Sequence, residues 1–482
     1  MPLATRRTKI VCTIGPASNT PERLGKLIEA GMDVARLNFS HGSYDAHAAV
    51  IKLIREAIAY YKRPISILQD LQGPKIRTSA LQDHQKVQLV DGATFTITSR
   101  PVIGTASLVS TTYTDLPNDV KVGDRILLTD GLIELRVVGV NPPDVQCIVV
   151  HGGMLGEHQG INLPGVAVSA PAMTEKDRAD LIFGVNQGVD YIALSFVRRP
   201  EDLEEAHTAI AVAQAALGIN GVPPIPLIAK IEKPEAIDHL DAIMAAADGI
   251  MVARGDLGVE MPLEQVPLIQ KRLIKMANEY EIPVITATQM LESMITNPRP
   301  TRAEVSDVAN AILDGTDAVM LSGETAMGQF PDETVRVMAR IAIETESNGR
   351  TARISSENET TAAQAISHAA RTLADQAHVK CIVVFTRSGA SARLISKDRP
   401  TVPIIAITPD DAVLRRLPLW WGVTPHAADL MESTEELIAW VDSHLQNEGF
   451  AQAGDRIVIL GGMPVARRAK TNFIKLHRIG EA

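Results

Sequence analysis

Short runs of apolar and β-branched residues alternate with longer amphipathic segments along most of this 482-residue chain, and this alternation restricts its fold most. Such alternation is typical of a parallel sheet in which a helix connects each strand to the next. Eight parallel strands are the number that closes a barrel. The sequence therefore predicts an α/β protein built on a (β/α)8 TIM barrel. The eight runs are 9–13, 34–39, 65–69, 191–196, 227–231, 250–253, 284–287 and 318–321.

The segments between these runs carry signals for the ends of helices. Thr20 and Pro21 provide an N-cap and a first-turn proline, and Gly31 can end the same helix. Thr301 and Glu304 form a capping box ahead of another apolar stripe. We expect these segments to form the outer ring of helices around the barrel.

Two further parts of the chain break this pattern. Residues 79–165 contain short strand-like runs separated by Gly, Pro, Asn and Asp turns, which predicts an all-β domain inserted after the third barrel strand, where it can act as a lid. The polar stretch 350–361 is interpreted as a linker to a further α/β domain. The predicted division is 1–78 with 166–348 for the barrel, 79–165 for the lid and 349–482 for the C-terminal domain.

Composition excludes several classes of protein. The formal net charge of -10 argues against nonspecific binding to nucleic acid or to anionic membranes. The three cysteines, Cys12, Cys147 and Cys381, form no CxxC pair, so neither a disulfide framework nor a zinc site is indicated. We find no signal sequence and no apolar stretch long enough to span a bilayer. We therefore expect a soluble, cytoplasmic protein.

Polar residues follow almost every predicted barrel strand, at the end where (β/α)8 enzymes carry their chemistry. Glu232 and Asp256 follow neighbouring strands with no histidine or cysteine beside them, a donor set that suits Mg2+ or Mn2+. Lys230 precedes Glu232 by two residues, so both point to the same side of their strand. The alternative is that these residues form no site, and that they are polar only because the loops after strands are exposed to water. The residues at these ends are Arg36, Asn38, Ser40, Asp70, Ser195, Lys230, Glu232, Arg254, Asp256, Thr288, Gln289, Ser322 and Glu324.

Lysine, arginine and a divalent metal gathered at one place would form a binding site for a multiply charged anion. Phosphoryl transfer requires such a site. The chain has neither a Walker A motif nor a protein-kinase glycine-rich loop with its partner motifs. Residues 254–258, RGDLG, are interpreted instead as a tight turn whose free backbone N–H groups can hold a carboxylate.

Over essentially its whole length the chain closely resembles the pyruvate kinase family. The resemblance implies transfer of the phosphoryl group of phosphoenolpyruvate to ADP, giving pyruvate and ATP, with Mg2+ or Mn2+ as cofactor and usually a homotetramer. It also implies a barrel, a lid and a C-terminal regulatory domain. The motifs that carry it are TKIVCTIGPA from Thr8, RLNFSHG from Arg36, DLQGPKIR from Asp70, AKIE from Ala229, MVARGDLGVE from Met251, TATQMLESM from Thr286 and the stretch from Pro300 to SGETA.

The resemblance assigns roles to single residues. Glu232 and Asp256 are expected to hold the divalent metal, and Lys230 to stabilise the phosphoryl group in transfer. Thr288 and the Gly255 and Asp256 amides are expected to hold the substrate carboxylate. Protonation of the enolate is expected through water near Thr288 and Ser322. Phosphate and nucleotide contacts are expected from Arg36, Arg77, His41 and Lys176, although Lys176 could equally be a solvated surface lysine.

Asn38, Ser40, Asp70 and the Leu71 carbonyl resemble the ligands of the family's monovalent-cation site. Members that require K+ carry an acidic residue where this chain has Lys75. An ammonium group near Asp70 could replace the charge of the ion, so we expect activity without added K+. The alternative is that Lys75 only pairs with a surface acid.

A loop in the C-terminal domain resembles the family's effector site, which implies regulation by a phosphorylated small molecule. Hydroxyl groups, amides and a helix N-terminus make it a plausible phosphate cradle, although such turns are also common for structural reasons. Its residues are Thr386, Arg387, Ser388, Gly389 and Ser391. Two rival functions stay open: a barrel lyase or aldolase acting on a pyruvate enolate without ADP, and a catalytically silent metabolite sensor.

Overall fold

Eight parallel strands form the closed barrel that the sequence predicts. The computed structural model describes residues 6–219, 223–349, 361–465 and 469–481, so most of the predicted linker lies outside the described residues. The strands follow one another in the order β1, β16, β15, β14, β13, β12, β3, β2. Their bounds are β1 Lys9–Thr13, β2 Val34–Asn38, β3 Ser66–Asp70, β12 Tyr191–Leu194, β13 Leu227–Ile231, β14 Gly249–Ala253, β15 Val284–Ala287 and β16 Ala318–Leu321.

Both faces of the barrel strands are buried, which explains why they read as continuous apolar runs rather than as alternating ones. Val11, Leu68 and Met251 pack inside the barrel, and Ile10, Ile67 and Val252 pack outward against the helices. These helices are α1 Pro21–Ala30, α2 Tyr44–Tyr61, α4 Glu175–Asn186, α5 Pro200–Ala216, α6 Pro234–Asp238, α7 Leu240–Ala246, α8 Arg254–Glu260, α9 Val266–Glu279, α10 Arg302–Leu313, α11 Gly323–Ala326 and α12 Pro331–Asn348.

The predicted helix caps are confirmed. Thr20 accepts a hydrogen bond from the Arg23 amide at the start of α1, and Gly31 ends that helix with a φ of 123°, a conformation that favours glycine. Thr301 and Glu304 form the reciprocal capping box of α10.

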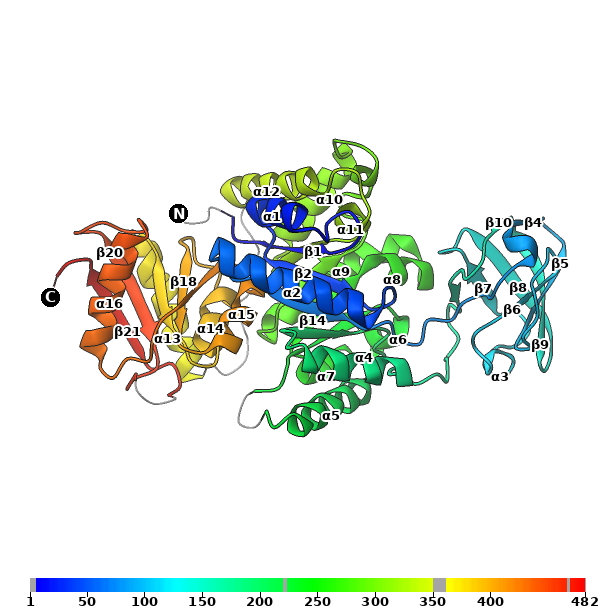
Figure 1. The fold of residues 1–482 in the computed structure, drawn as a ribbon, viewed down its shortest axis with the longest axis horizontal. Coiled ribbons are helices and arrows are strands. Elements are labelled where there is room, and N and C mark those ends of the chain that lie inside the picture. The colour runs from blue at the N-terminus through cyan, green and yellow to red at the C-terminus, as the bar shows by residue number, and fades with distance from the viewer. Residues whose placement is uncertain (1–5, 220–222, 350–360, 466–468, 482) are drawn as a thin grey trace.

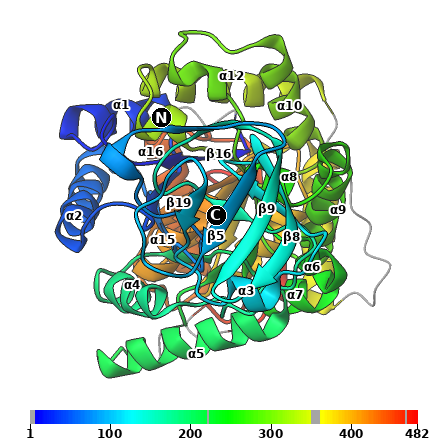
Figure 2. The same ribbon diagram turned by 90° about the vertical axis from the view of Figure 1, so that its right-hand side faces the viewer.

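The segment after β3 forms a separate β unit, which we call the inserted unit. A six-stranded sheet and a two-stranded sheet enclose their own apolar core, with one short helix, α3 Leu116–Asp119. Figure 1 shows the inserted unit to the right of the barrel, and in Figure 2, which is viewed from that side, the same unit lies in front of the barrel. The strands are β4 Val87–Leu89, β5 Thr94–Thr98, β6 Leu108–Ser110, β7 Arg125–Leu128, β8 Ile133–Asn141, β9 Asp144–His151, β10 Gly153–Leu155 and β11 Ile161–Asn162.

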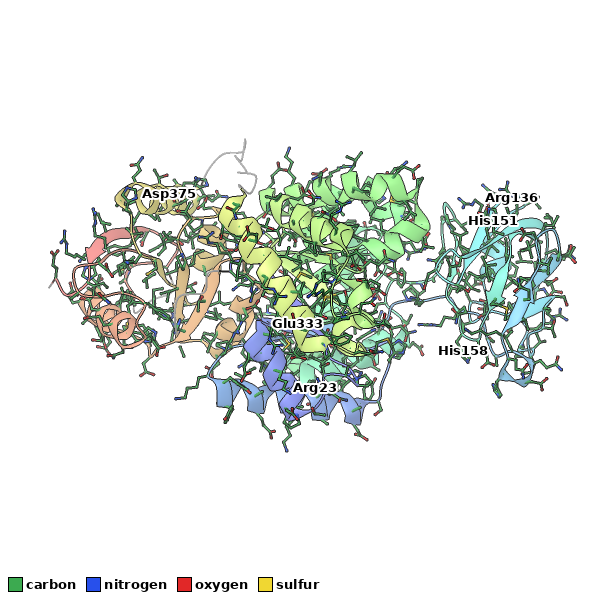
Figure 3. All side chains as sticks on the ribbon, turned by 90° about the horizontal axis from the view of Figure 1, so that it is seen from above. Arg23, Arg136, His151, His158, Glu333 and Asp375 are labelled. Carbon is green, nitrogen blue, oxygen red and sulfur yellow. The ribbon has the colours of Figure 1, made fainter. Side chains whose placement is uncertain are left out.

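The C-terminal unit lies at the opposite end of the barrel, and the view from above in Figure 3 shows the same order, with Asp375 on this unit and His151 on the inserted one. Its sheet has the order β19, β18, β17, β20, β21, and β21 is antiparallel to β20. None of the helices in the described parts of the chain is long and apolar enough to cross a lipid bilayer. The elements are α13 Ala362–Ala377, β17 Ile382–Phe385, α14 Ala390–Lys397, β18 Ile404–Thr408, α15 Asp411–Arg416, β19 Val423–Ala427, α16 Thr434–Asn447, β20 Arg456–Gly461 and β21 Phe473–Arg478.

Candidate active site

Lys230, at the C-terminal end of β13, contacts polar groups from three neighbouring strands. Its Nζ lies 2.9 Å from Glu232 Oε1 and 3.2 Å from Asp70 Oδ1, and it donates a hydrogen bond of 2.7 Å to Ser195 Oγ. Lys230 is 9% exposed and both carboxylates are 1% exposed. The structure therefore brings together residues that are up to 162 positions apart, because parallel strands end at the same edge of the barrel.

Arg36 supplies a second cation from β2, the strand beside β3. Its Nη2 lies 2.6 Å from Asp70 Oδ2, and its Nη1 donates to Thr13 Oγ1 at 2.9 Å. Asp70 Oδ1, which faces Lys230, receives no well-directed hydrogen bond from the groups described, so its contact with Lys230 is an ion pair without hydrogen-bond geometry. Asp70 thus lies between two cations at the floor of the site.

The ionisation of this cluster follows from burial and from its charges. Burial alone lowers the pKa of Lys230, but Asp70 and Glu232 outweigh burial and the pKa lies well above its ordinary value. Burial would raise the pKa of Asp70, yet Lys230 and Arg36 bring it below its ordinary value. Burial raises the pKa of Glu232, and Asp256 and Asp70 add to this effect while Lys230 opposes it. Lys230 and Asp70 are therefore charged at neutral pH.

Glu232 and Asp256 provide the oxygen donors that a hard divalent cation would use. Asp256 lies in the first turn of α8, directly after β14, and Glu232 Oε2 accepts a hydrogen bond of 2.8 Å from the Phe196 amide. Across the described ranges no group of three or more His, Cys, Asp or Glu side chains is gathered as a metal site. Mg2+ is commonly bound by one or two carboxylates, with its other coordination positions occupied by water and substrate oxygens, and two carboxylates fit this pattern.

The predicted tight turn at residues 254–258 is wrong, because this segment is the start of helix α8. The Gly255 amide donates a hydrogen bond of 2.7 Å to Thr288 Oγ1, so it is not free as expected. The reason is that the first amides of a helix have no partner within the helix, and here the end of β15 lies close enough to provide one. Thr288 and Gly255 are nevertheless brought together as predicted.

Thr288 has a strained backbone, and Arg254 holds it in place. Its φ is 67°, a left-handed conformation that is uncommon for a β-branched residue. Arg254 Nη2 donates to the Thr288 carbonyl at 2.7 Å, while Arg254 Nη1 lies 2.7 Å from Asp307 Oδ2 on α10. From the sequence, Arg254 was predicted only to lie at a strand end. Its contact with the Thr288 carbonyl could not be predicted, because the two residues follow different strands, β14 and β15.

Ser322 and Ser195 complete the floor of the site. Ser322 follows β16, next to β15, and its amide donates to Glu324 Oε2 at 2.7 Å. Ser195 accepts the hydrogen bond from Lys230 and donates one of 2.6 Å to the Leu71 carbonyl. The sequence listed Ser195 among the strand ends without a function, and the structure shows that it fixes the Lys230 ammonium.

Lys75 was expected near Asp70, and the acid with which it forms an ion pair in the structure is Asp256. Lys75 Nζ lies 3.9 Å from Asp256 Oδ1, and the cations at Asp70 are Arg36 and Lys230. The loop after β3 leads away toward the inserted unit, which carries Lys75 past the end of its own strand. The other residues expected to bind a monovalent cation have partners within the protein. Asn38 pairs in register with Asp70, and its Oδ1 accepts a hydrogen bond of 3.1 Å from the Ser40 amide. The Leu71 carbonyl accepts a hydrogen bond from Ser195.

The predicted nucleotide-contacting residues lie around the mouth of the site. Burial lowers the pKa of His41, and the cations Arg77, Lys75 and Arg36 lower it further, so these groups act on one another. Arg77 donates to the His158 carbonyl of the inserted unit at 3.0 Å. Lys176 donates to the Phe39 carbonyl at 2.8 Å and pairs with Asp180 at 2.6 Å. The positive charge near His41 favours an anionic ligand.

The predicted effector loop connects β17 to α14 and borders a cavity of about 260 Å³. The Thr386 hydroxyl accepts a hydrogen bond of 3.0 Å from the Gly389 amide, and Gly389 has a φ of 84°. Ser391 contacts Thr471 at 2.7 Å between hydroxyl oxygens. Arg387, Ser388 and Lys470 also line the cavity. The loop therefore has hydroxyl and cationic groups around a space large enough for a phosphate group.

Comparison with known proteins agrees with this geometry. Residues 5–335 match the family model described as pyruvate kinase, barrel domain, and residues 364–477 match pyruvate kinase, alpha/beta domain. Pyruvate kinases of Geobacillus stearothermophilus and Mycobacterium intracellulare are each 48% identical to the chain, over 99% of it and over 81% and 99% of their own lengths. The crystal structure of a pyruvate kinase from Cryptosporidium parvum superposes with a TM-score of 0.91 at 37% identity, covering 99% of this chain and 97% of that one. The chain belongs to the pyruvate kinase family.

Proposed function

We propose that the protein transfers the phosphoryl group of phosphoenolpyruvate to ADP, giving pyruvate and ATP. The observation that carries this proposal is the Lys230 cluster, in which two cations and three carboxylates from the four strands β2, β3, β13 and β14 meet at one end of the barrel. Such an arrangement binds and stabilises a multiply charged phosphoryl group without needing a nucleophilic side chain.

In the proposed reaction, different residues bind the phosphoryl group, the substrate carboxylate and the metal. Lys230, charged and fixed by Ser195, neutralises the phosphoryl oxygens, and Arg36 does so from the other side of Asp70. Thr288 and the Asp256 amide in the first turn of α8 orient the substrate carboxylate, while Ser322 holds water for protonation of the enolate. Glu232 and Asp256 would hold Mg2+ or Mn2+, which when bound polarises phosphoryl and enolate oxygens.

A coupled assay for pyruvate formation tests this function against its rivals. We expect pyruvate to form from phosphoenolpyruvate only when both ADP and a divalent cation are added. A lyase or aldolase would consume phosphoenolpyruvate or a keto acid without ADP, and a silent sensor would give no product at all. The intact cluster around Lys230 favours the enzyme over the sensor.

We also propose the division into a barrel at 1–78 and 166–348, a lid at 79–165 and a C-terminal regulatory domain at 349–482. The separate apolar cores of the inserted unit and the C-terminal unit support it. A cytoplasmic location is supported by three buried, unpaired cysteines, Cys12, Cys147 and Cys381. The resemblance to the family supports a homotetramer.

We expect the enzyme to work without K+, because Lys75 brings a tethered ammonium to the site. The ammonium group of Lys75 forms an ion pair with Asp256. Asp70 forms ion pairs with Arg36 and Lys230. In tetramethylammonium buffer, adding K+ should change turnover by less than about twofold, whereas Lys75→Glu, which restores the family's acidic residue, should need K+. A collapse of wild-type turnover that only K+ restores would contradict this prediction.

We propose that the cavity at Thr386–Ser391 binds a phosphorylated effector. Calorimetry with a sugar bisphosphate, a hexose monophosphate and a nucleotide should identify one that binds, and Ser391→Ala should weaken it at least about tenfold by removing a hydroxyl from the cradle. Ser396→Ala is a matched control on the same helix, since its hydroxyl bonds to the Trp421 carbonyl outside the cavity. Equal affinity in the wild type and Ser391→Ala would remove this assignment.

A further inference from the structure

A second cavity, of about 560 Å³, lies between the N-terminal end of the barrel and the C-terminal unit. The barrel side contributes the start of β12, α5, the segment 223–226, α7 and the end of α9, and the other side contributes α14, α15 and Trp420. This volume falls in the range of sites for small molecules, and the proposed catalytic residues lie at the opposite end of the strands. The cavity is therefore separate from the candidate active site.

Arg416 is the arginine of this cavity that forms no ion pair within the described residues, although Asp190 and Asp410 act on its charge from farther away. It is half-buried, its Nη2 makes a long hydrogen bond of 3.4 Å to the Pro223 carbonyl, and within the described ranges no carboxylate forms an ion pair with it. The adjacent Arg415, by contrast, lies 3.0 Å from Asp190 Oδ1. A partly desolvated guanidinium without a counter-ion is costly, and a bound anion would relieve that cost.

The acids that line the same cavity already have cationic or polar partners. Glu281 accepts a 2.5 Å hydrogen bond from Gln364 and lies 3.8 Å from Arg393. Asp248 lies 3.6 Å from His207 and accepts a hydrogen bond from the Leu227 amide at 2.9 Å. Among the described residues that line the cavity, Arg416 is therefore the arginine that can form an ion pair with a bound anion without breaking an existing one.

Part of the remaining lining is apolar. Pro223, Pro224 and Pro226 line one side, and Leu417 and Trp420 line the other. A ligand held here would place an acidic group at Arg416 and an apolar body against prolines and an indole ring. We propose that this interdomain pocket binds a small organic anion in which an apolar body adjoins one phosphate or carboxylate group.

The position of the pocket connects it with two other parts of the molecule. Ser388 and Ala390 line both this pocket and the cavity of the effector loop, so one loop separates the two. The Arg416 carbonyl accepts a hydrogen bond of 2.7 Å from Tyr191, the first residue of β12, whose other end leads to Ser195. The experiment must therefore show that the pocket binds by itself and not through the neighbouring cavity.

Calorimetry on the full-length chain with 1-naphthyl phosphate as probe tests the proposal without relying on turnover. We expect Arg416→Gln to weaken binding at least about tenfold, through loss of a charge-assisted hydrogen bond. Ala245→Trp, at an exposed position that lines the cavity, should abolish binding by filling the space. 2-Naphthol, which lacks the charge, and inorganic phosphate, which lacks the ring, should each bind at least about tenfold more weakly.

Three controls make the result decisive. Arg415→Gln removes the neighbouring guanidinium, which does not line the cavity, and should leave probe affinity within about twofold. Ser391→Ala, in the adjacent cavity, should also leave it unchanged. 1-Naphthoate distinguishes a carboxylate site from a phosphate site, and binding of either supports the proposal. Wild-type protein that binds neither probe, Arg416→Gln that binds like the wild type, or loss of binding in Ser391→Ala would overturn it.

Discussion

Replacing Lys230 by methionine is expected to lower kcat by roughly a thousandfold while the protein still folds. The substitution keeps a similar length and removes the ammonium that lies between Asp70, Glu232 and Ser195. In the proposed reaction, that charge stabilises the phosphoryl group most strongly during transfer. The loss should therefore appear mainly in kcat rather than in the KM for phosphoenolpyruvate, and steady-state kinetics with both substrates varied measures the two separately.

The Lys230 variant also needs a control for stability, since two buried carboxylates lose their cation and the free energy of unfolding should fall by about 3 kcal/mol. Lys9→Met is a matched control. Lys9 is also a buried lysine on a barrel strand, but it lies at the other end of the barrel, where its Nζ donates to the Val423 carbonyl at 2.7 Å. Lys9→Met should lose stability and keep its turnover. Comparable losses of turnover in both variants would show that Lys230 is only a structural residue.

Replacing Glu232 by glutamine should weaken binding of the divalent cation by about a hundredfold or more. The two side chains have the same shape, but the amide carries no charge and its nitrogen cannot act as a ligand. The substitution also leaves Lys230 with one acid fewer, so part of the loss of turnover will persist at saturating metal. Electron paramagnetic resonance of bound Mn2+ measures the affinity directly and does not depend on catalysis.

Asp190→Asn provides the comparison for Glu232→Gln. Asp190 is a buried acid at the N-terminal end of the barrel, where Arg55 and Arg415 each lie 3.0 Å from it. Its replacement should reduce stability and leave the affinity for Mn2+ unchanged. The metal assignment fails if Glu232→Gln binds Mn2+ as tightly as the wild type does, or if Asp190→Asn weakens Mn2+ binding equally.

Much of the barrel could be predicted because its strands are encoded locally. Lys9–Thr13, Leu227–Ile231, Val284–Ala287 and Ala318–Leu321 have the predicted bounds. The other four strands differ from the prediction by one or two residues at one or both ends. Burial of both faces requires apolar residues throughout each strand, and the caps of α1 and α10 depend on residues only a few positions apart. In the C-terminal unit, β19 and the antiparallel β21 were not predicted, because β19 alternates buried with half-buried residues and β21 has a single buried residue, so neither forms a continuous apolar run.

The sequence by itself determined the eight-stranded barrel, the family and the set of polar residues at the strand ends, because these depend on local patterns and on long motifs. The tertiary structure decided which of those residues touch. It paired Lys75 with Asp256, gave Ser195 and Arg254 their partners, and made RGDLG part of a helix. Contacts between side chains of different strands depend on register and on the path of each loop, and neither is encoded in the residues that make the contact.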